Sequence, residues 1–196
     1  MKWPLLLLFA ATGALWAGDE GRLFFSKAFP GSVPAYMQVT LDQKGNAEYR
    51  EAPDDELPLK FHLTDADTQA VFDLAGKLDH FKRALESPLK VAFMGKKTFR
   101  WEVGGQKTET EFNYSEDVSA QQLLDWFERM AESAQHRIDL ERSAKYDRLG
   151  VDKSLRLLWS AIDRKRLKGV ALVPLHVDTR AAIDEMERAV SKLGPT

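Results

Sequence analysis

Four histidines are the first residues to consider for chemistry, because an imidazole can serve as a general base or as a metal ligand. They are His62, His80, His136 and His176. None lies three or four residues from another, and no acidic pair joins them in a zinc-binding spacing such as His-Glu-x-x-His. We expect the first three to be exposed structural side chains. His176 lies in the apolar segment 170–177, where we expect a half-buried side chain, so we predict no metal site.

Nucleophilic catalysis has little support in the residue pattern. The chain has no cysteine, and no serine lies in a Gly-x-Ser-x-Gly elbow, since Gly31-Ser32 is followed by Val33-Pro34. The sequence Gly-Lys-Lys-Thr at 95–98 resembles the end of a phosphate-binding loop, but the glycine five residues earlier is absent. The acidic cluster at 54–56 would bind calcium only loosely, and a solvated turn is the ordinary outcome there. We therefore expect no catalytic residue and no cofactor.

Residues 22–36 have an aromatic and proline-rich composition that favours a fixed conformation. One interpretation is a strand followed by an ordered loop that covers the core. The other is a surface that receives an extended peptide or another protein, since rigid aromatic side chains and a strand edge favour such contacts. On the second interpretation, the partner contacts Phe29, Pro30, Pro34 and Tyr36.

The N-terminus has the order of features of a secretory signal peptide. Lys2 precedes an apolar or small run at 5–17, and an acidic pair at 19–20 follows directly. A membrane anchor or a first core element would also be apolar, but about 13 residues are fewer than the roughly 20 that span a bilayer. We predict a signal peptide at 1–17, cleaved after Ala17 or, as a second option, after Ala14.

The predicted mature protein is soluble and either periplasmic or secreted, with no membrane insertion after cleavage of the leader. Without cysteine it can form neither a disulfide nor a lipoprotein thioether anchor. A hydrophobic content of 44% is enough for one or two ordinary cores. The net charge of −2 argues against binding to nucleic acid, which would need a strongly basic face.

Alternation of apolar and polar residues predicts antiparallel strands in the first half of the chain. Residues 36–51 fit a hairpin with a type I turn at 42–45, and 57–63 fit a third strand whose start is disturbed by Pro58. Two further strands flank the glycine pair at 104–105, which is typical of a two-residue hairpin loop. That loop would place Glu102 opposite Lys107 and Arg100 opposite Glu109 on one face, with Phe99 facing Thr110 and Trp101 facing Thr108 on the other.

Helical spacing dominates the second half. A first helix follows its cap Thr64, and its predicted buried face is Val71, Leu74, Ala75 and Leu78. Ser119 is the expected cap of the next helix, with Val118 as a hydrophobic staple, and 116–149 fit one long helix or two. A further helix after Gly150 would bury Val151, Leu155, Leu158 and Ile162. The last helix, 179–193, would turn Ile183, Met186 and Val190 inward.

These elements predict an α+β fold in which an antiparallel sheet of hairpins packs with helices and a helical C-terminal half follows. We expect residues 18–196 to form a single globule. Within it, 18–114 are mainly sheet with one helix, and 115–196 are mainly helical.

The sequence Phe-Phe-Ser-Lys-Ala-Phe-Pro-Gly-Ser-Val-Pro-Ala-Tyr at 24–36, followed by Gly-Asn-Ala-Glu-Tyr-Arg-Glu at 45–51, resembles the opening of exported bacterial proteins of unknown function, of the acidobacterial type. The resemblance extends through Asp-Trp-Phe-Glu-Arg at 125–129, and it is weaker in the C-terminal third. It also includes a loose similarity to a module of unknown function in which a Pro-x-Tyr turn precedes a hairpin. The resemblance implies a bacterial source and no particular activity.

The sequence therefore favours an exported, non-catalytic protein that binds a protein or a peptide. The alternative is an enzyme or a small-ligand-binding protein whose site is assembled from residues distant in sequence. A cleft with several convergent polar side chains would favour the alternative, and an exposed aromatic surface would favour the binding protein.

The signal peptide predicts where the mature chain begins. N-terminal sequencing of the protein isolated from its own cells should find a start between Leu15 and Asp19, in a soluble extracytoplasmic fraction. Retention of Met1 in a cytoplasmic fraction would contradict the prediction of export.

Overall fold

The computed structural model describes residues 20–169. The predicted signal peptide, His176 with its apolar segment 170–177, and the predicted last helix 179–193 lie outside the described residues.

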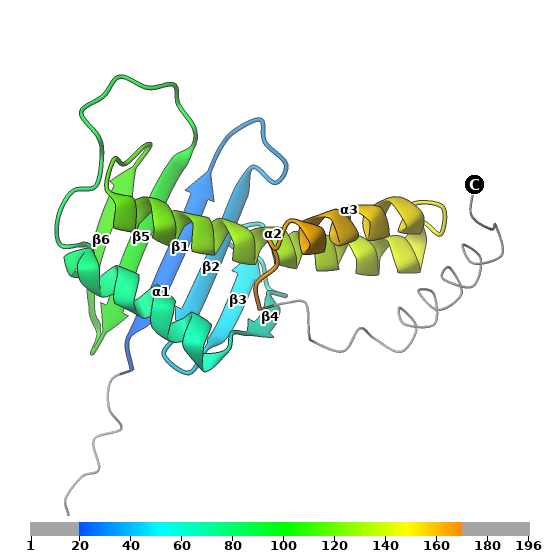
Figure 1. Ribbon diagram of the computed structural model, residues 1–196, viewed down its shortest axis with the longest axis horizontal. Helices are drawn as coiled ribbons and strands as arrows, with labels where there is room; N and C mark the ends of the chain where they lie inside the picture. Colours follow the sequence, from blue (N-terminus) through cyan, green and yellow to red (C-terminus); the bar gives the residue numbers. More distant parts are fainter. Residues whose placement is uncertain (1–19, 170–196) are drawn as a thin grey trace, which may run out of the picture.

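Six strands form one antiparallel sheet (Figure 1). Their order across the sheet is β4-β3-β2-β1-β5-β6, so the N-terminal strand lies in the middle. The strands are β1 (Arg22–Ala28), β2 (Tyr36–Asp42), β3 (Asn46–Arg50), β4 (Leu59–His62), β5 (Lys96–Val103) and β6 (Gln106–Phe112).

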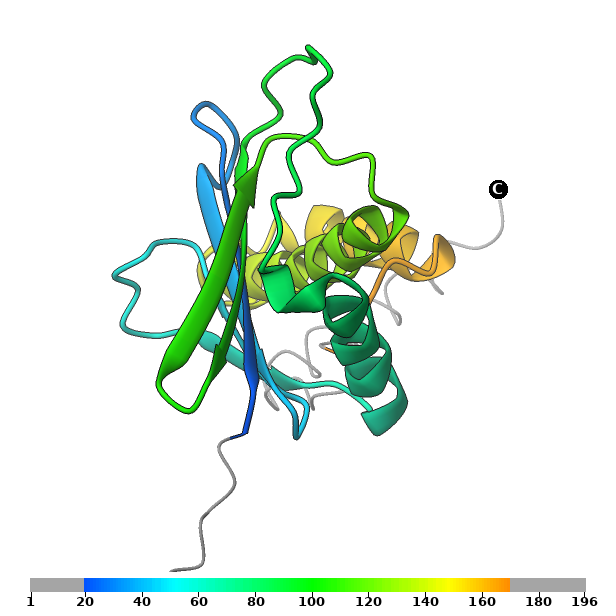
Figure 2. The same ribbon diagram turned by 90° about the vertical axis from the view of Figure 1, so that its left-hand side faces the viewer.

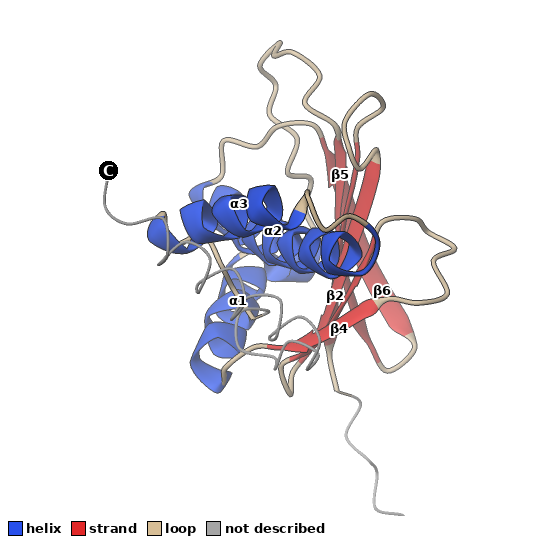
Figure 3. Cartoon of the chain, turned by 90° about the vertical axis from the view of Figure 1, so that its right-hand side faces the viewer, coloured by secondary structure: helices blue, strands red, loops and turns tan. Residues whose placement is uncertain are grey.

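Two helices, α1 (Asp65–Lys77) and α2 (Val118–Tyr146), cover one face of this sheet (Figures 2 and 3). A short 3₁₀ turn, η1 (Asp79–Phe81), follows α1. The long helix α2 runs across the sheet and past its β4 edge, and α3 (Val151–Asp163) folds back along the projecting half (Figure 1). The predicted α+β class, with helices in the C-terminal half, is confirmed. No helix within residues 20–169 is long and apolar enough to cross a membrane.

The β5–β6 hairpin has the predicted register. Its turn is the pair Gly104 (φ 59°) and Gly105 (φ 71°), and two positive φ angles are what a type I′ turn requires. The four predicted pairs are all present: Glu102 with Lys107, Arg100 with Glu109, Phe99 with Thr110, and Trp101 with Thr108. Charge pairing and apolar pairing therefore agree on one register.

The β2–β3 hairpin is also as predicted, and β4 is shorter than predicted. At the turn, the Gly45 amide donates to the Asp42 carbonyl (3.1 Å), and Gly45 has a φ of 84°. β4 begins at Leu59 rather than at residue 57, because Pro58 cannot donate a ladder hydrogen bond. Leu57, predicted to be part of the alternation, is 89% exposed.

The start of α1 confirms its predicted cap. The Thr64 hydroxyl accepts a hydrogen bond from the Asp67 amide (3.2 Å). The four residues of the predicted apolar face, Val71, Leu74, Ala75 and Leu78, are all buried.

The predicted cap of α2 is wrong by two residues. Asp117 caps the helix, because one of its carboxylate oxygens accepts from the amides of Ser119 (2.8 Å) and Ala120 (3.1 Å). The hydrogen bond from Arg83 (2.6 Å) holds the pKa of Asp117 below its ordinary value, so the cap is charged. Val118 is 66% exposed and cannot act as a staple. Residues 118–146 form one continuous helix rather than two.

The buried face predicted for α3 is only partly correct. Val151 is buried and Leu155 and Leu158 are half-buried, but Ile162 is 47% exposed and Ala161 is buried in its place. The difference arises because α2 packs against only one side of α3, and the apolar arc of α3 is wider than that side.

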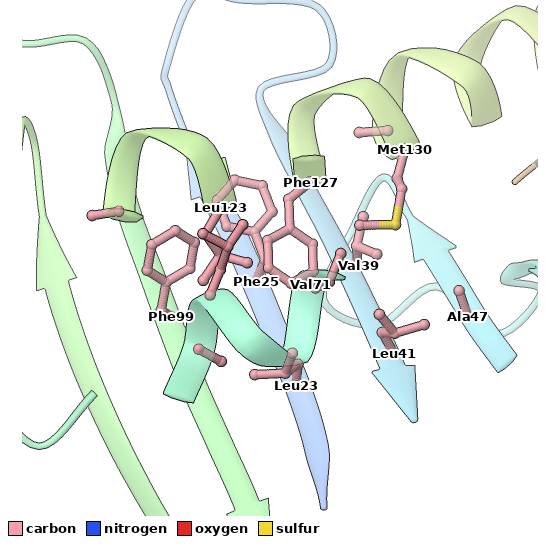
Figure 4. Close-up of a cluster of buried hydrophobic side chains, with 14 of the residues drawn as sticks. Leu23, Phe25, Val39, Leu41, Ala47, Val71, Phe99, Leu123, Phe127 and Met130 are labelled. Carbon is pink, nitrogen blue, oxygen red and sulfur yellow. The ribbon is translucent and has the colours of Figure 1, made fainter. Parts of the chain in front are cut away.

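The core lies between the sheet and the two covering helices (Figure 4), and Phe99 packs against four other aromatic rings in it. The ring of Phe99 lies 5.1–6.0 Å, between centroids, from the rings of Phe25, Phe81, Phe112 and Phe127. Phe25 and Phe127 stack on each other at 5.1 Å. This cluster ties β1, β5, β6, η1 and α2 together.

The glycine turn of the β5–β6 hairpin gives a test of the fold. Replacing Gly104 and Gly105 with valine should lower the free energy of unfolding by about 2–4 kcal/mol, since each left-handed conformation costs a β-branched residue about 1–2 kcal/mol. Urea unfolding measures this change. Gly76→Ala is the control, because that helical position has open space and should gain up to about 1 kcal/mol. Unchanged stability of the double variant would contradict the two-residue turn.

Candidate binding site at the loop end of the sheet

Two loops lie side by side at one end of the sheet (Figures 1 and 2). One is the β1–β2 loop at 29–35, and the other is the segment 86–95 that leads into β5. The rings of Phe29 and Phe93 meet edge to face, with centroids 5.9 Å apart. We call these two segments together the loop end.

The β1–β2 loop is held by its own hydrogen bonds. The Phe29 amide donates to the Ala35 carbonyl (2.9 Å), which closes the loop at its base. The Ser32 hydroxyl lies 2.7 Å from the carbonyl oxygens of both Phe29 and Pro34. Val33, between these anchors, is 100% exposed. The loop is therefore a fixed support that presents an apolar tip.

Asn113, just after β6, anchors the segment 86–95. Its side-chain oxygen accepts from the Met94 amide (2.6 Å), and its side-chain nitrogen donates to the Ala92 carbonyl (3.0 Å). The Ser87 amide donates to the Tyr114 carbonyl (2.8 Å) at the other end of the segment. Both ends of the segment 86–95 are thus hydrogen-bonded to the two residues that follow β6.

The side chains of the loop end are apolar and exposed. Phe93 is 58% exposed and Leu89 is 53% exposed, and Val33 is on the neighbouring loop. Met94 and Val91 are also exposed. Large apolar side chains gathered on anchored loops are unusual on a monomer, and they are typical of an interaction site.

A cavity of about 220 Å³ opens beneath the β1–β2 loop. Phe29 and Pro34 form its apolar wall. Its floor is an ion pair between Lys27 Nζ and Glu128 Oε1, 2.7 Å apart. The complete lining is Lys27, Phe29, Ser32, Val33, Pro34, Met37, Glu128, Ala131, Glu132, Gln135 and Arg166.

Glu128 also lines a second cavity, of about 260 Å³, which lies beneath the segment 86–95 and contains Lys97. Lys97 is buried, and its ammonium donates to the carbonyls of Met94 (3.2 Å), Gly95 (3.1 Å) and Asn113 (2.6 Å). Burial lowers the pKa of Lys97, and the neighbouring charge of Lys27 lowers it further. Lys97 therefore fixes the base of the segment at the cost of desolvating a cation.

The structure brings together three of the four residues predicted to contact a partner. Phe29 and Pro34 line the first cavity, and Pro30 is exposed beside them. Tyr36 lies on the face of the sheet opposite the helices, where its hydroxyl donates to Gln38 (2.8 Å) and burial raises its pKa. It does not contribute to the loop end.

Sequence reasoning missed the second loop and Lys97. The only local signal was the apolar run at 89–94, bounded by Pro88 and Gly95. That run has neither the period of a helix nor that of a strand, so nothing in the sequence indicates that it lies beside the aromatic loop at 29–35.

The described histidines are dispersed. His62 is exposed on β4 as predicted, whereas His80, also expected to be exposed, is half-buried and packs on Trp101 with ring centroids 4.6 Å apart. His136, expected to be exposed, is half-buried on α2, with Nε2 3.9 Å from Glu132. In residues 20–169, no group of three or more acidic or histidine side chains is arranged to hold a metal ion.

Comparison with known proteins gives no family: no family model matches the chain, and a search of curated proteins finds no match. Function is therefore inferred from the geometry of the loop end.

Buried Lys97 predicts a pH dependence of stability. Its pKa in the folded protein lies below the ordinary 10.5, so the unfolded chain binds the proton more tightly. Raising the pH from the lowered pKa to 10.5 should therefore increase the free energy of unfolding relative to Lys97→Met. At neutral pH the free energy of unfolding of Lys97→Met should be lower by about 1–3 kcal/mol, because the carbonyls of Met94, Gly95 and Asn113 lose their buried donor.

Urea unfolding at a series of pH values measures both effects. Lys90→Met, at an exposed lysine of the same segment, is the matched control and should follow the wild type at every pH. If the free energies of unfolding of the wild type and Lys97→Met differed by the same amount at every pH, the lowered pKa of Lys97 would be refuted.

Proposed function

We propose that this chain is an exported bacterial binding protein whose loop end contacts an apolar segment of a protein or peptide partner. The observation that carries the proposal is the exposure of Val33, Phe93 and Leu89 on two anchored loops. Export rests on the N-terminal signal sequence, and a bacterial source rests on the resemblance of residues 24–36 and 45–51. The location is the periplasm or the extracellular space.

Anchoring favours binding, because a fixed loop loses little conformational entropy when a partner arrives. The hydrogen bonds of Ser32 and Asn113 supply this preorganisation in the two loops. The exposed apolar side chains can then contribute their desolvation free energy to the complex.

The polar groups beneath the loops support a binding role over a catalytic one. Lys27 is paired with Glu128, and Lys97 is saturated by three carbonyls. Arg166 pairs with Glu132 (2.8 Å) and Asp125 (2.9 Å). Groups held in this way stabilise the base of the site, and a reaction would first have to break these pairs.

The loop end also has the arrangement of an interface, with an apolar centre and charges at its rim. Lys96, at the start of β5, pairs with Glu111 (2.6 Å) and remains half exposed. Lys90 is exposed within the apolar segment itself. These charges would orient a partner, and the apolar side chains would supply most of the affinity.

A second candidate function is the binding of a small ligand in the 220 Å³ cavity. The observation that favours it is the combination of an apolar wall, Phe29 and Pro34, with two cations, from β1 and the segment after α3, and two carboxylates from α2. Such a mixture suits a small molecule that carries both apolar and charged groups.

The proposed contact surface predicts a loss of partner capture in a double variant. Val33→Asp with Phe93→Asp should weaken capture from a periplasmic extract at least tenfold, because the loss of a hot-spot side chain at the centre of an interface costs about 2 kcal/mol or more, and each 1.4 kcal/mol is tenfold in affinity. The melting curve should change little, since Val33 is fully exposed and Phe93, 58% exposed, loses only its edge-to-face contact with Phe29. Captured species are identified by mass spectrometry and then titrated as purified proteins.

Leu149→Asp is the matched control. Leu149 is 94% exposed in the turn between α2 and α3, which lies past the β4 edge of the sheet (Figure 1), so its variant should capture normally. Equal capture by all three proteins would refute the proposed surface. Normal capture by the double variant together with loss in Glu128→Gln would move the binding site to the cavity.

A further inference from the structure

The exposed flank of α3 carries an apolar stripe. The face of α3 that meets α2 is identified by buried Val151 and Ala161 and by the contact of Ser154 Oγ with Ser143 Oγ (2.9 Å). Leu155, Trp159 and Ile162 follow one another at spacings of four and three residues, so they share the neighbouring flank. Trp159 is 72% exposed and Ile162 is 47% exposed.

The position of α3 explains why the stripe is uncovered. The helix packs along the half of α2 that projects past the β4 edge, so the sheet cannot cover it (Figure 1). A helix that meets one neighbour needs only a narrow apolar seam, and α3 has a wider apolar arc than that. The extra width indicates a second packing partner.

We propose that this partner is the segment 179–193 of the same chain, which docks on the Leu155, Trp159 and Ile162 stripe. Ile183, Met186 and Val190 are spaced by three and four residues, so a helix there would present one apolar stripe. Six of the remaining positions are charged, and Gly194-Pro195 ends the pattern. Two narrow apolar stripes of matching length would then bury each other.

The point at which the chain leaves the described structure suits this docking. The Lys168 amide donates to Ser133 Oγ (2.8 Å), and the Lys168 ammonium pairs with Asp67 (3.1 Å). The chain is therefore held against the middle of α2, beside the end of α3. The nine residues 170–178 can span up to about 30 Å, whereas α3 is only about 20 Å long, so the segment can reach the whole stripe.

The tether favours this occupant over a second copy of the chain. A linker of nine residues keeps the segment at an effective concentration in the millimolar range, far above that of another molecule in dilute solution. A weak apolar contact is then sufficient for docking.

Disulfide cross-linking of the mature chain tests the proposal. Because the chain has no native cysteine, any disulfide must join introduced residues. Ile162→Cys combined with Ile183→Cys should form an intramolecular disulfide in dilute solution. The control combines Ile162→Cys with Glu185→Cys, which has nearly the same tether but projects from the opposite side of a helix. The stripe pair should close at least tenfold faster. Equal rates would overturn docking, and a disulfide between two chains would assign the stripe to a second copy.

Hydrogen exchange gives a second measurement that does not depend on the orientation of the segment. Met186→Asp should speed amide exchange in α3 at 155–162 at least tenfold relative to the wild type. Arg188→Asp, two residues away on the opposite side, should leave it unchanged. Identical exchange in the wild type and both variants would overturn the proposal.

Discussion

The stacking of Phe127 on Phe25, with Phe99 packed against both, is the contact on which the rest of the structure depends. It sets where α2 crosses the sheet, because the two rings must meet above the middle strand. Glu128 follows Phe127, and Lys27 lies two residues after Phe25 on the same face of β1. The core contact therefore places these two charges 2.7 Å apart. The ion pair that forms the floor of the cavity beneath the β1–β2 loop is thus a consequence of aromatic packing.

A sheet buried on one side must make its other face compatible with water. Antiparallel sheets do this by alternation, and this face carries polar and charged side chains between a few aromatic ones. Arg100 lies over the ring of Phe24, 3.8 Å from its centroid, and it also approaches Glu109 across the β5–β6 ladder (3.4 Å). Tyr36 belongs to this face, so the alternation of β2 separates it from Phe29 and Pro34.

The sequence predicts the features that are set by neighbours along the chain. The register around Gly104 and the cap at Thr64 depend on residues within a few positions, and both are correct. The prediction that Ser119 caps α2 is wrong because Asp117, two residues earlier, competes for this role. Its carboxylate accepts hydrogen bonds from two of the free amides at the start of the helix. The contact of Phe29 with Phe93 and the pairing of Lys27 with Glu128, 101 residues apart, carry no local signal and follow only from the strand order.

The exposure of apolar side chains at the loop end requires its own support, because a free apolar loop would collapse onto the nearest apolar surface. Asn113 and Lys97 prevent this by binding the backbone of the segment before β5 at several points. Lys97 is a costly anchor, since a buried ammonium loses its hydration, but it donates to three carbonyls, those of Met94, Gly95 and Asn113. These anchors hold the backbone of the segment in place, so a partner would meet the exposed apolar surface already formed.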